Sequence, residues 1–354
     1  MINAATRRVE NAEARAYIFA LAPHLTPCDV SGASAAAMAI PTPNDTPNEG
    51  FERAPLLRLA DALGDFERDA KAAYTARETG QPRGPQTGFE ALDRHLGYAL
   101  APGLHAIHGN AGAGKTAFAS QLAARCGFPA LFVSCEMAPG ELLRRHAARE
   151  TKTYLGKFKS GEFSPEHARE LARRAIVAAP LLRLLDATRA PAPPNHIRDC
   201  ARETQGDAKG LLIVVDSLQS WVEGLAGGAG EYEALNDGVK HLRALAHGLN
   251  APILFVSERN RDSIKSGGLN AGAGSRKIEY GAETVFDLDR DMDAQGDGAG
   301  EVEVTLRIAK NRHGAAGVAL PLKFNGALQS FRELSAEEAV ERARAKTTKK
   351  ERLS

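Results

Sequence analysis

Eight consecutive residues restrict the fold more than any other part of the chain. They are Gly109-Asn110-Ala111-Gly112-Ala113-Gly114-Lys115-Thr116, which match the pattern G-x-x-x-x-G-K-[ST]. An apolar run, 104–108, precedes them and a helical stretch, 117–126, follows. In this setting the glycines let backbone N–H groups surround phosphate oxygens, and the helix start adds the positive end of its dipole. The segment is a P-loop, which predicts that the chain binds a nucleoside triphosphate together with Mg²⁺.

Two side chains of the P-loop, and one acid further along, have predicted roles. Lys115 would reach the outer phosphates, and Thr116 would offer its hydroxyl to Mg²⁺. A second apolar run, 211–216, ends in Asp216, as expected of a buried strand whose last carboxylate holds the metal directly or through water. Such runs are common in parallel sheets, so this metal assignment depends on the P-loop upstream.

Two more carboxylates follow apolar runs that would end at the same edge of a sheet. The run 131–136 ends in Glu136, which we predict to be the general base for phosphoryl transfer to water. The alternative is that Glu136 caps a helix expected at 139–150. The run 252–257 is followed by Glu258, whose position suits a sensor of the γ-phosphate.

Lys310 and Arg312 are two residues apart at the end of an alternating segment. Side chains at this spacing on a strand point to the same side. Paired cations suit a clamp on phosphate charge. From the residues alone, a pair of solvated charges at a strand end is an equally good interpretation.

Apolar runs alternate with helical stretches along most of the chain, which predicts an α/β fold with a mostly parallel sheet and helices on both faces. The apolar runs are 104–108, 129–135, 181–186, 211–216, 252–257 and 284–288. The helical stretches are near 116–126, 139–150, 163–178 and 232–249. Segments 301–309 and 316–332 read as strands joined by a turn at His313-Gly314, so the sheet is expected to end in an antiparallel hairpin.

The chain is expected to contain four regions. Residues 1–54 are proline-rich beyond residue 22 and predict a poorly structured N-terminal region and linker. Residues 55–85 predict a linker helix to about Thr79 and then a hinge. The ATPase domain would occupy 86–334. Residues 335–354 predict a charged tail, with a short helix and a frayed basic end at 346–350; we favour a solvated tail over a DNA-binding arm.

Composition limits the partners and the compartment. The formal net charge of +1 gives no overall attraction to nucleic acid, so a DNA site would have to be local. The four cysteines form no C-x-x-C pair, which argues against a zinc site or a disulfide framework and favours a reducing cytoplasm. No apolar stretch is long enough to predict a membrane span.

Taken together, residues 87–331 resemble the RecA-fold motor domain of DnaB-type hexameric replicative helicases. Four segments match the family directly: T-G-F-x-x-L-D at 87–93, Ala-Pro-Gly at 101–103, Leu-Arg-Ala-Leu-Ala at 242–246 and I-A-K-x-R-x-G at 308–314. Three more stand in place of family motifs: 134–137 for S-L-E-M, 216–219 for D-Y-L-Q and 257–261 for S-Q-L-N-R. Their joint occurrence in this order is far more specific than the P-loop alone.

The resemblance implies a ring of six subunits with ATP at each interface, working as a helicase or translocase on single-stranded DNA during replication. The short N-terminus suggests a phage, a plasmid or another mobile element. Lys310 and Arg312 would reach the γ-phosphate bound to a neighbouring subunit. Segments 222–232 and 262–277 match the loops that line the central channel, and the candidate DNA contacts are Lys265, Arg276 and Lys277. Plain flexible loops are the alternative.

Two departures from the family pattern affect these expectations. Glu258 stands where the family has glutamine, and a carboxylate facing a γ-phosphate would repel it unless it is paired with Arg259 or Arg261, protonated or turned toward metal. The family's helical N-terminal domain is not recognisable in 1–54. A helicase loader or primase is a further expected partner, but contacts made through that domain are not carried over.

The alternatives to a helicase are a RecA- or RadA-like recombination ATPase and a KaiC-like regulatory ATPase that does no work on DNA.

Overall fold

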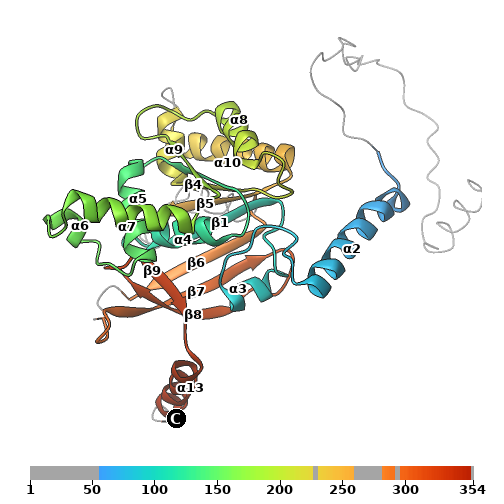
Figure 1. Ribbon diagram of the computed structural model, residues 1–354. Coiled ribbons are helices and arrows are strands. Elements are labelled where there is room, and N and C mark those ends of the chain that lie inside the picture. Colours follow the sequence, from blue (N-terminus) through green and yellow to red (C-terminus); the bar gives the residue numbers. More distant parts are fainter. Residues whose placement is uncertain (1–55, 226–229, 259–280, 292–295, 352–354) are drawn as a thin grey trace, which may run out of the picture. The chain divides into compact units, whose positions relative to one another are not determined.

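The structure is a computed structural model that describes residues 56–225, 230–258, 281–291 and 296–351 (Figure 1). The chain divides into two compact units, Met1–Arg58 and Leu59–Ser354, and nearly all described residues belong to the second. The predicted N-terminal region, 1–54, therefore lies outside the described residues.

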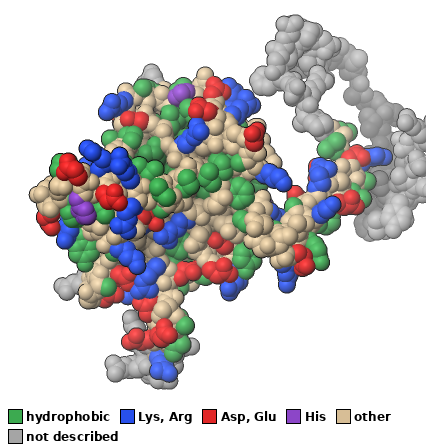
Figure 2. Space-filling model, in the orientation of Figure 1, with side chains coloured by type: hydrophobic (Ala, Val, Ile, Leu, Met, Phe, Trp, Pro, Cys, Tyr) green, Lys and Arg blue, Asp and Glu red, His purple; other side chains and the backbone are tan. Residues whose placement is uncertain are grey.

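The first described helices lie where a linker helix is predicted. A short 3₁₀ helix, η1 (Leu59–Ala62), leads into α2 (Leu63–Thr79). Gly80 follows in the left-handed conformation, with φ 69°, which ends the helix before the predicted hinge. None of the residues of α2 is buried, and apolar side chains lie among charged ones on its surface (Figure 2).

Among the described residues, nine strands form one sheet in the order β3-β2-β4-β5-β1-β6-β7-β8-β9. Strands β1 to β6 are parallel to their neighbours, and β6 to β9 pair antiparallel. The strands are β1 (Gly103–Gly109), β2 (Ala130–Ser134), β3 (Leu182–Asp186), β4 (Leu212–Asp216), β5 (Pro252–Glu258), β6 (Thr284–Arg290), β7 (Glu301–Asn311), β8 (Ala319–Asn325) and β9 (Ser330–Glu333). The predicted α/β fold with a mostly parallel sheet is confirmed.

The antiparallel end of the sheet differs from the predicted hairpin. Segment 316–332 is divided between β8 and β9, so three strands rather than two extend the sheet beyond β6. The division occurs because the Asn325 side chain accepts a hydrogen bond from Leu328 N at 3.0 Å, and Gln329 adopts a positive φ of 54°. Together these residues reverse the chain within a short turn.

Helices cover both faces of the sheet (Figure 1). One face packs in a cluster with α3 (Glu90–His95), α4 (Lys115–Arg125) and α5 (Pro139–Glu150), and α7 (Pro165–Ala178) packs on α5. The other face packs with α8 (Pro194–Gln205), α9 (Leu218–Leu225) and α10 (Glu231–Leu249). Neighbouring residues Ala106 and Ile107 of β1 contribute to different clusters, because successive side chains of a strand point to opposite faces. The short helix α6 (Lys157–Ser160) joins α5 to α7.

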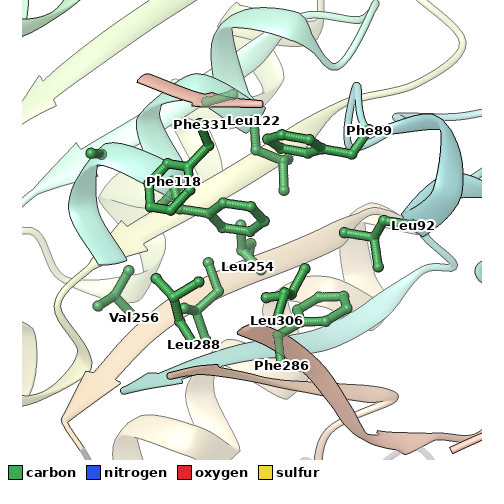
Figure 3. Close-up of a cluster of buried hydrophobic side chains, with 14 of the residues drawn as sticks. Phe89, Leu92, Phe118, Leu122, Leu254, Val256, Phe286, Leu288, Leu306 and Phe331 are labelled. Carbon is green, nitrogen blue, oxygen red and sulfur yellow. The ribbon is translucent and has the colours of Figure 1, made fainter. Parts of the chain in front are cut away.

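The cluster beneath the P-loop is built around Phe118 of α4 (Figure 3). Its ring stacks on Phe89 with centroids 5.2 Å apart and meets Phe331 of β9 edge-on at 5.4 Å. Phe118 is fully buried. These contacts join the segment before β1, the helix after the P-loop and the last strand of the sheet into one core.

The T-G-F-x-x-L-D segment has a structural role in this core. The Asp93 carboxylate accepts hydrogen bonds from the backbone N and the hydroxyl of Thr87, at 2.7 and 2.8 Å, and from Gly88 N at 3.1 Å. Burial nevertheless raises the pKa of Asp93, with these hydrogen bonds acting in the opposite direction. The bonds hold the turn that directs Phe89 into the core.

The last described helix, α13 (Ala336–Glu351), corrects one expectation. The backbone stays helical through 346–350, where a frayed end was predicted. A helix continues as long as each residue can add another backbone hydrogen bond, and nothing in this stretch is a helix breaker. No helix among the described residues is both long and apolar enough to cross a membrane.

Gln121 fastens α4 to β9 and provides a test of this packing. Its side-chain amide donates to Phe331 O, and its carbonyl accepts from Phe331 N, both at 2.8 Å. We expect Gln121→Leu to lower the free energy of unfolding by roughly 2 to 5 kcal/mol, because two buried backbone groups lose their partner. Urea denaturation would measure the change. The exposed control Gln81→Leu should stay within about 0.5 kcal/mol of the parent, and an equal effect of both variants would contradict this packing role.

Candidate nucleotide-binding site

The carboxyl ends of the parallel strands bring the predicted site residues together. Ser134 at the end of β2 pairs with Asp216 at the end of β4, and Gly109 at the end of β1 pairs with Glu258 at the end of β5. A cavity of about 420 Å³ opens over this edge. Its lining includes Lys115, Thr116, Glu136, Asp216 and Glu258.

The P-loop lies where two of its glycines cannot be replaced without a clash. A Cβ on Gly109 would lie 2.6 Å from Leu288 O of the adjacent strand β6. Gly114 has a φ of 94°, and a Cβ there would lie 2.9 Å from Phe331 Cζ. Gly114 also directly precedes α4, so Lys115 and Thr116 form the first turn of that helix. Its exposed N–H groups and dipole therefore face the cavity.

Lys115 is folded back onto the loop from which it comes. Its Nζ donates to Gly109 O at 2.9 Å and to Asn110 O at 3.0 Å, and the side chain is only 9% exposed. Burial lowers the pKa of Lys115, whereas the carboxylates of Glu258, Asp216 and Glu136 act to raise it. The ammonium group is thus placed where phosphate oxygens could replace the two carbonyl oxygens.

Asp216 has the properties expected of a metal ligand. Its Oδ1 is buried and has no hydrogen-bond partner among the described residues, and the nearby Thr116 hydroxyl acts to lower the pKa of the carboxyl group. Burial raises the pKa of Asp216 to about 6. A buried carboxylate oxygen of this kind beside a hydroxyl is a donor set that suits Mg²⁺, which prefers hard oxygen ligands and retains several waters. These two residues therefore fit the predicted ion.

Glu136 follows β2 and faces the turn after β4. Its Oε1 accepts hydrogen bonds from Ser217 Oγ at 2.5 Å and Ser220 Oγ at 2.9 Å. The alternative role as a helix cap does not fit, because the N-cap of α5 is Ala138 and no side chain caps that end. The carboxylate is instead held beside Asp216, at the edge where a water could be activated.

Glu258 faces the P-loop lysine. Its Oε1 lies 3.9 Å from Lys115 Nζ, and its side chain is 65% exposed. Arg259 and Arg261, the cations expected to pair with it, lie outside the described residues. Since water screens so exposed a group, its attraction to Lys115 is modest.

Four residues in the cavity wall carry no local signal in the sequence. Arg145 of α5 donates to Gln329 Oε1 at 2.7 Å, and both line the cavity. Arg290, at the end of β6, donates to Gly112 O at 3.2 Å, with its guanidinium 5.6 Å from the centre of the Phe324 ring. The four residues, Arg145, Arg290, Phe324 and Gln329, come from α5, β6, β8 and the β8–β9 turn, so only the tertiary fold brings them to the P-loop.

Lys310 and Arg312 lie at the opposite edge of the sheet from their own P-loop. Lys310 pairs with Val285, which pairs with Ala106 in the middle of β1, and Arg312 N bonds to O of Glu283, whose own N bonds to Leu104 O near the start of β1. Gly109 is three residues further along β1 than Ala106, roughly 10 Å in the strand direction at about 3.3 Å per residue. Lys310 Nζ donates to Ala282 O at 2.7 Å, and Arg312 NH1 donates to Glu283 Oε1 at 3.3 Å. The two cations therefore contact the amino edge of the sheet.

The predicted channel segments are mostly undescribed. Lys265, Arg276 and Lys277 lie outside the described residues. In the other segment, 222–232, α9 extends to Leu225 and α10 begins at Glu231, so both ends are helical and 226–229 are undescribed.

Residues 84–333 match the family of the DnaB-like helicase C terminal domain. The chain belongs to this family. The resemblance inferred from the sequence motifs is thereby confirmed.

Relatives of known description agree with this membership. Over 262 residues the chain is 29% identical to the replicative DNA helicase DnaB of Treponema pallidum (strain Nichols), covering 70% of this chain and 56% of the relative. It is 30% identical over 185 residues to DnaB of Nostoc sp., covering 49% and 20%. A probable plasmid replicative DNA helicase of Chlamydia psittaci is 26% identical over 263 residues, covering 70% and 55%. The chain thus spans from a fifth to just over half of the length of these relatives.

Solved structures agree on the fold. One of them, described as an ATPase domain, superposes with a TM-score of 0.65 at 20% identity, covering 79% of this chain and all of that one. A DnaB-like replicative helicase, described together with its interactions with primase, gives a TM-score of 0.64 at 21% identity, covering 79% and 68%. The described core has a RecA-like ATPase fold.

The charge on Glu258 leads to a prediction about nucleotide affinity. We expect Glu258→Gln to bind ATP roughly three- to tenfold more tightly, because it removes a negative charge near the phosphates and a competitor for Lys115. ADP should gain less, since it lacks the phosphate that the sensor position would face. Fluorescence titration with labelled nucleotides would measure both affinities. Glu170→Gln, at an exposed position of α7, is the control, and weaker ATP binding by Glu258→Gln would refute the assignment.

Proposed function

We propose that this protein is an ATP-dependent helicase or translocase that acts on single-stranded DNA as a ring of subunits, with six as the expected number, in DNA replication. Membership of the DnaB-like family supports the activity. The observation that carries the ring is the separation of Lys310 and Arg312 from the P-loop of their own chain. A phosphate clamp at the amino edge of the sheet can work only on a nucleotide held by a second copy.

The proposed division of labour is that of phosphoryl transfer to water. Lys115 and the N–H groups of the P-loop bind the phosphates of ATP, and Thr116 and Asp216 would hold Mg²⁺, which when bound would neutralise charge on the phosphates. Glu136 accepts a proton from the water that attacks the γ-phosphorus. The bond between that phosphorus and the β–γ bridging oxygen breaks, leaving ADP and phosphate. Lys310 and Arg312 of the neighbouring subunit stabilise the charge that develops in the transition state.

The arrangement also suggests why this family membership is compatible with a near-neutral chain. A ring surrounds its substrate, so a few cations per subunit, repeated around the channel, can bind a strand without a basic surface elsewhere. Lys265, Arg276 and Lys277 remain the proposed contacts. A primase or a helicase loader remains a proposed partner, with the primase suggested by the description of the DnaB-like structural relative.

The test is ATPase activity with and without single-stranded DNA, together with strand unwinding and the oligomer mass in ATP. We expect stimulation by DNA, a closed assembly near six times the chain mass, and loss of DNA binding as salt rises. A filament on DNA would instead favour a recombination ATPase. Hydrolysis that ignores DNA, with no binding at low salt, would favour a regulatory ATPase.

Mixed assemblies test the shared site directly. Lys115→Ala subunits keep Lys310 and Arg312, whereas Arg312→Ala subunits keep an intact P-loop. Each variant alone should lose at least about 99% of the parental rate. An equal mixture should recover roughly a quarter of the parental rate, because about one head-to-tail interface in four would combine both intact halves. Absence of recovery, with mixed assembly established by native mass spectrometry, would contradict a site shared between subunits.

A further inference from the structure

Arg312 is held by a carboxylate of its own chain. Glu283, which directly precedes β6, accepts from Arg312 NH1 at 3.3 Å with Oε1 and from His313 Nε2 at 3.0 Å with Oε2. The two oxygens of one carboxylate therefore bind two consecutive side chains after β7. The Arg312 side chain is 45% exposed, whereas that of Glu283 is 18% exposed.

Glu283 is itself fixed in place by the sheet. Its backbone N donates to Leu104 O at 2.7 Å, and its carbonyl accepts from Arg312 N at 2.9 Å. Its side chain packs over Gly103, where a Cβ would lie 2.6 Å from Glu283 Cγ, and Gly103 has a φ of 131°. A glycine at the start of β1 thus leaves the space that this side chain fills. Backbone bonds and packing together hold the carboxylate in one place relative to β1.

From this cluster we propose that Glu283 is a positioning residue for Arg312, aiming its guanidinium at the nucleotide of the neighbouring subunit. This inference rests on the proposed function, in which Arg312 acts in trans. A partly exposed arginine samples many rotamers, and fixing one of them costs conformational entropy. The contact with Glu283 holds the Arg312 side chain in one rotamer before the subunits meet. Because a guanidinium carries five donors in a rigid fork, a bond to a carboxylate and bonds to a phosphate are geometrically compatible.

Without the contact to Glu283, the guanidinium of Arg312 keeps its charge but is displaced from its position. Catalysis that depends on charge placement falls steeply with small errors in geometry, whereas nucleotide binding by the P-loop does not involve this edge of the sheet. Replacement of Glu283 should therefore lower kcat and leave the KM for ATP nearly unchanged. It should also have no effect once Arg312 is absent, because Glu283 acts through that side chain.

The experiment compares full-length Glu283→Ala, Arg312→Ala and the double variant in steady-state ATPase assays. We expect kcat to fall about tenfold for Glu283→Ala and at least about a hundredfold for Arg312→Ala. The double variant should be no slower than Arg312→Ala. Glu283→Gln keeps an acceptor oxygen and should recover part of the rate. As a control, Glu303→Ala removes the ion pair between Glu303 of β7 and Arg342, and its kcat should stay within about twofold of the parent.

Each outcome separates the positioning role from the function on which it rests. Parental kcat in Glu283→Ala, or a double variant that multiplies the two losses, overturns the role of Glu283 while the shared site stands. Parental kcat in an assembled Arg312→Ala protein overturns the shared site itself.

A second variant decides the matter if Glu283→Ala loses its fold or its assembly, as judged by thermal unfolding and native mass. Glu283→Gln then takes its place in the comparison with Arg312→Ala. A kcat between those of the parent and Arg312→Ala, with the KM for ATP unchanged and no further loss in the double variant Glu283→Gln/Arg312→Ala, supports positioning. A loss that persists in the absence of Arg312, or no loss at all, overturns it.

Discussion

The P-loop fits against the sheet only because two of its residues lack a side chain. Gly109 lies against Leu288 O of β6, and Gly114 lies against the ring of Phe331. The second contact links the nucleotide site to the core, because the same ring packs edge-on against Phe118. A well-packed core barely yields to an added methyl group. The position of the first turn of α4, and with it that of Lys115, is therefore set by the aromatic packing beneath the loop.

The charged groups at the carboxyl edge of the sheet are not balanced within the protein, and a bound ligand would complete their arrangement. Glu136, Asp216 and Glu258 act on the single ammonium group of Lys115. Burial raises the pKa of Asp216 to about 6 and so disfavours the ionised form that a metal needs. The pKa of Asp216 is higher in the folded chain than in the unfolded chain. Protonated Asp216 therefore stabilises the fold at low pH, and this contribution to the free energy of unfolding is lost as pH rises through about 6. Near neutral pH the site therefore gives up stability that Mg²⁺ would restore on binding.

The sequence predicts best those parts whose physics is local. Buried parallel strands are continuous apolar runs, so the predicted ends of β1, β2 and β4 lie close to the observed ones, and a carboxylate after such a run must lie at the ligand edge. Two features escape prediction for a physical reason. The division between β8 and β9 depends on a side-chain bond of Asn325 within a polar turn. The contacts of Arg145 and Arg290 join elements far apart in the chain, and no local pattern in the sequence predicts contacts of this kind.

The two edges of the sheet have different chemistry, and this asymmetry explains why one chain holds only part of the proposed machine. The carboxyl edge collects helix N-termini and carboxylates, as in any open α/β sheet. The amino edge faces the opposite, negative ends of those helix dipoles, and its cations lie on the antiparallel strand β7 and just beyond it, where the strand direction carries the chain back toward the start of β1. A phosphate bound at one edge can therefore meet a cation from the other only across a head-to-tail contact. Repeated head-to-tail contacts close into a ring when the rotation allows it. In the proposed ring, the reversal of β7 would thus give each subunit one edge that binds the nucleotide and another that supplies cations to its neighbour.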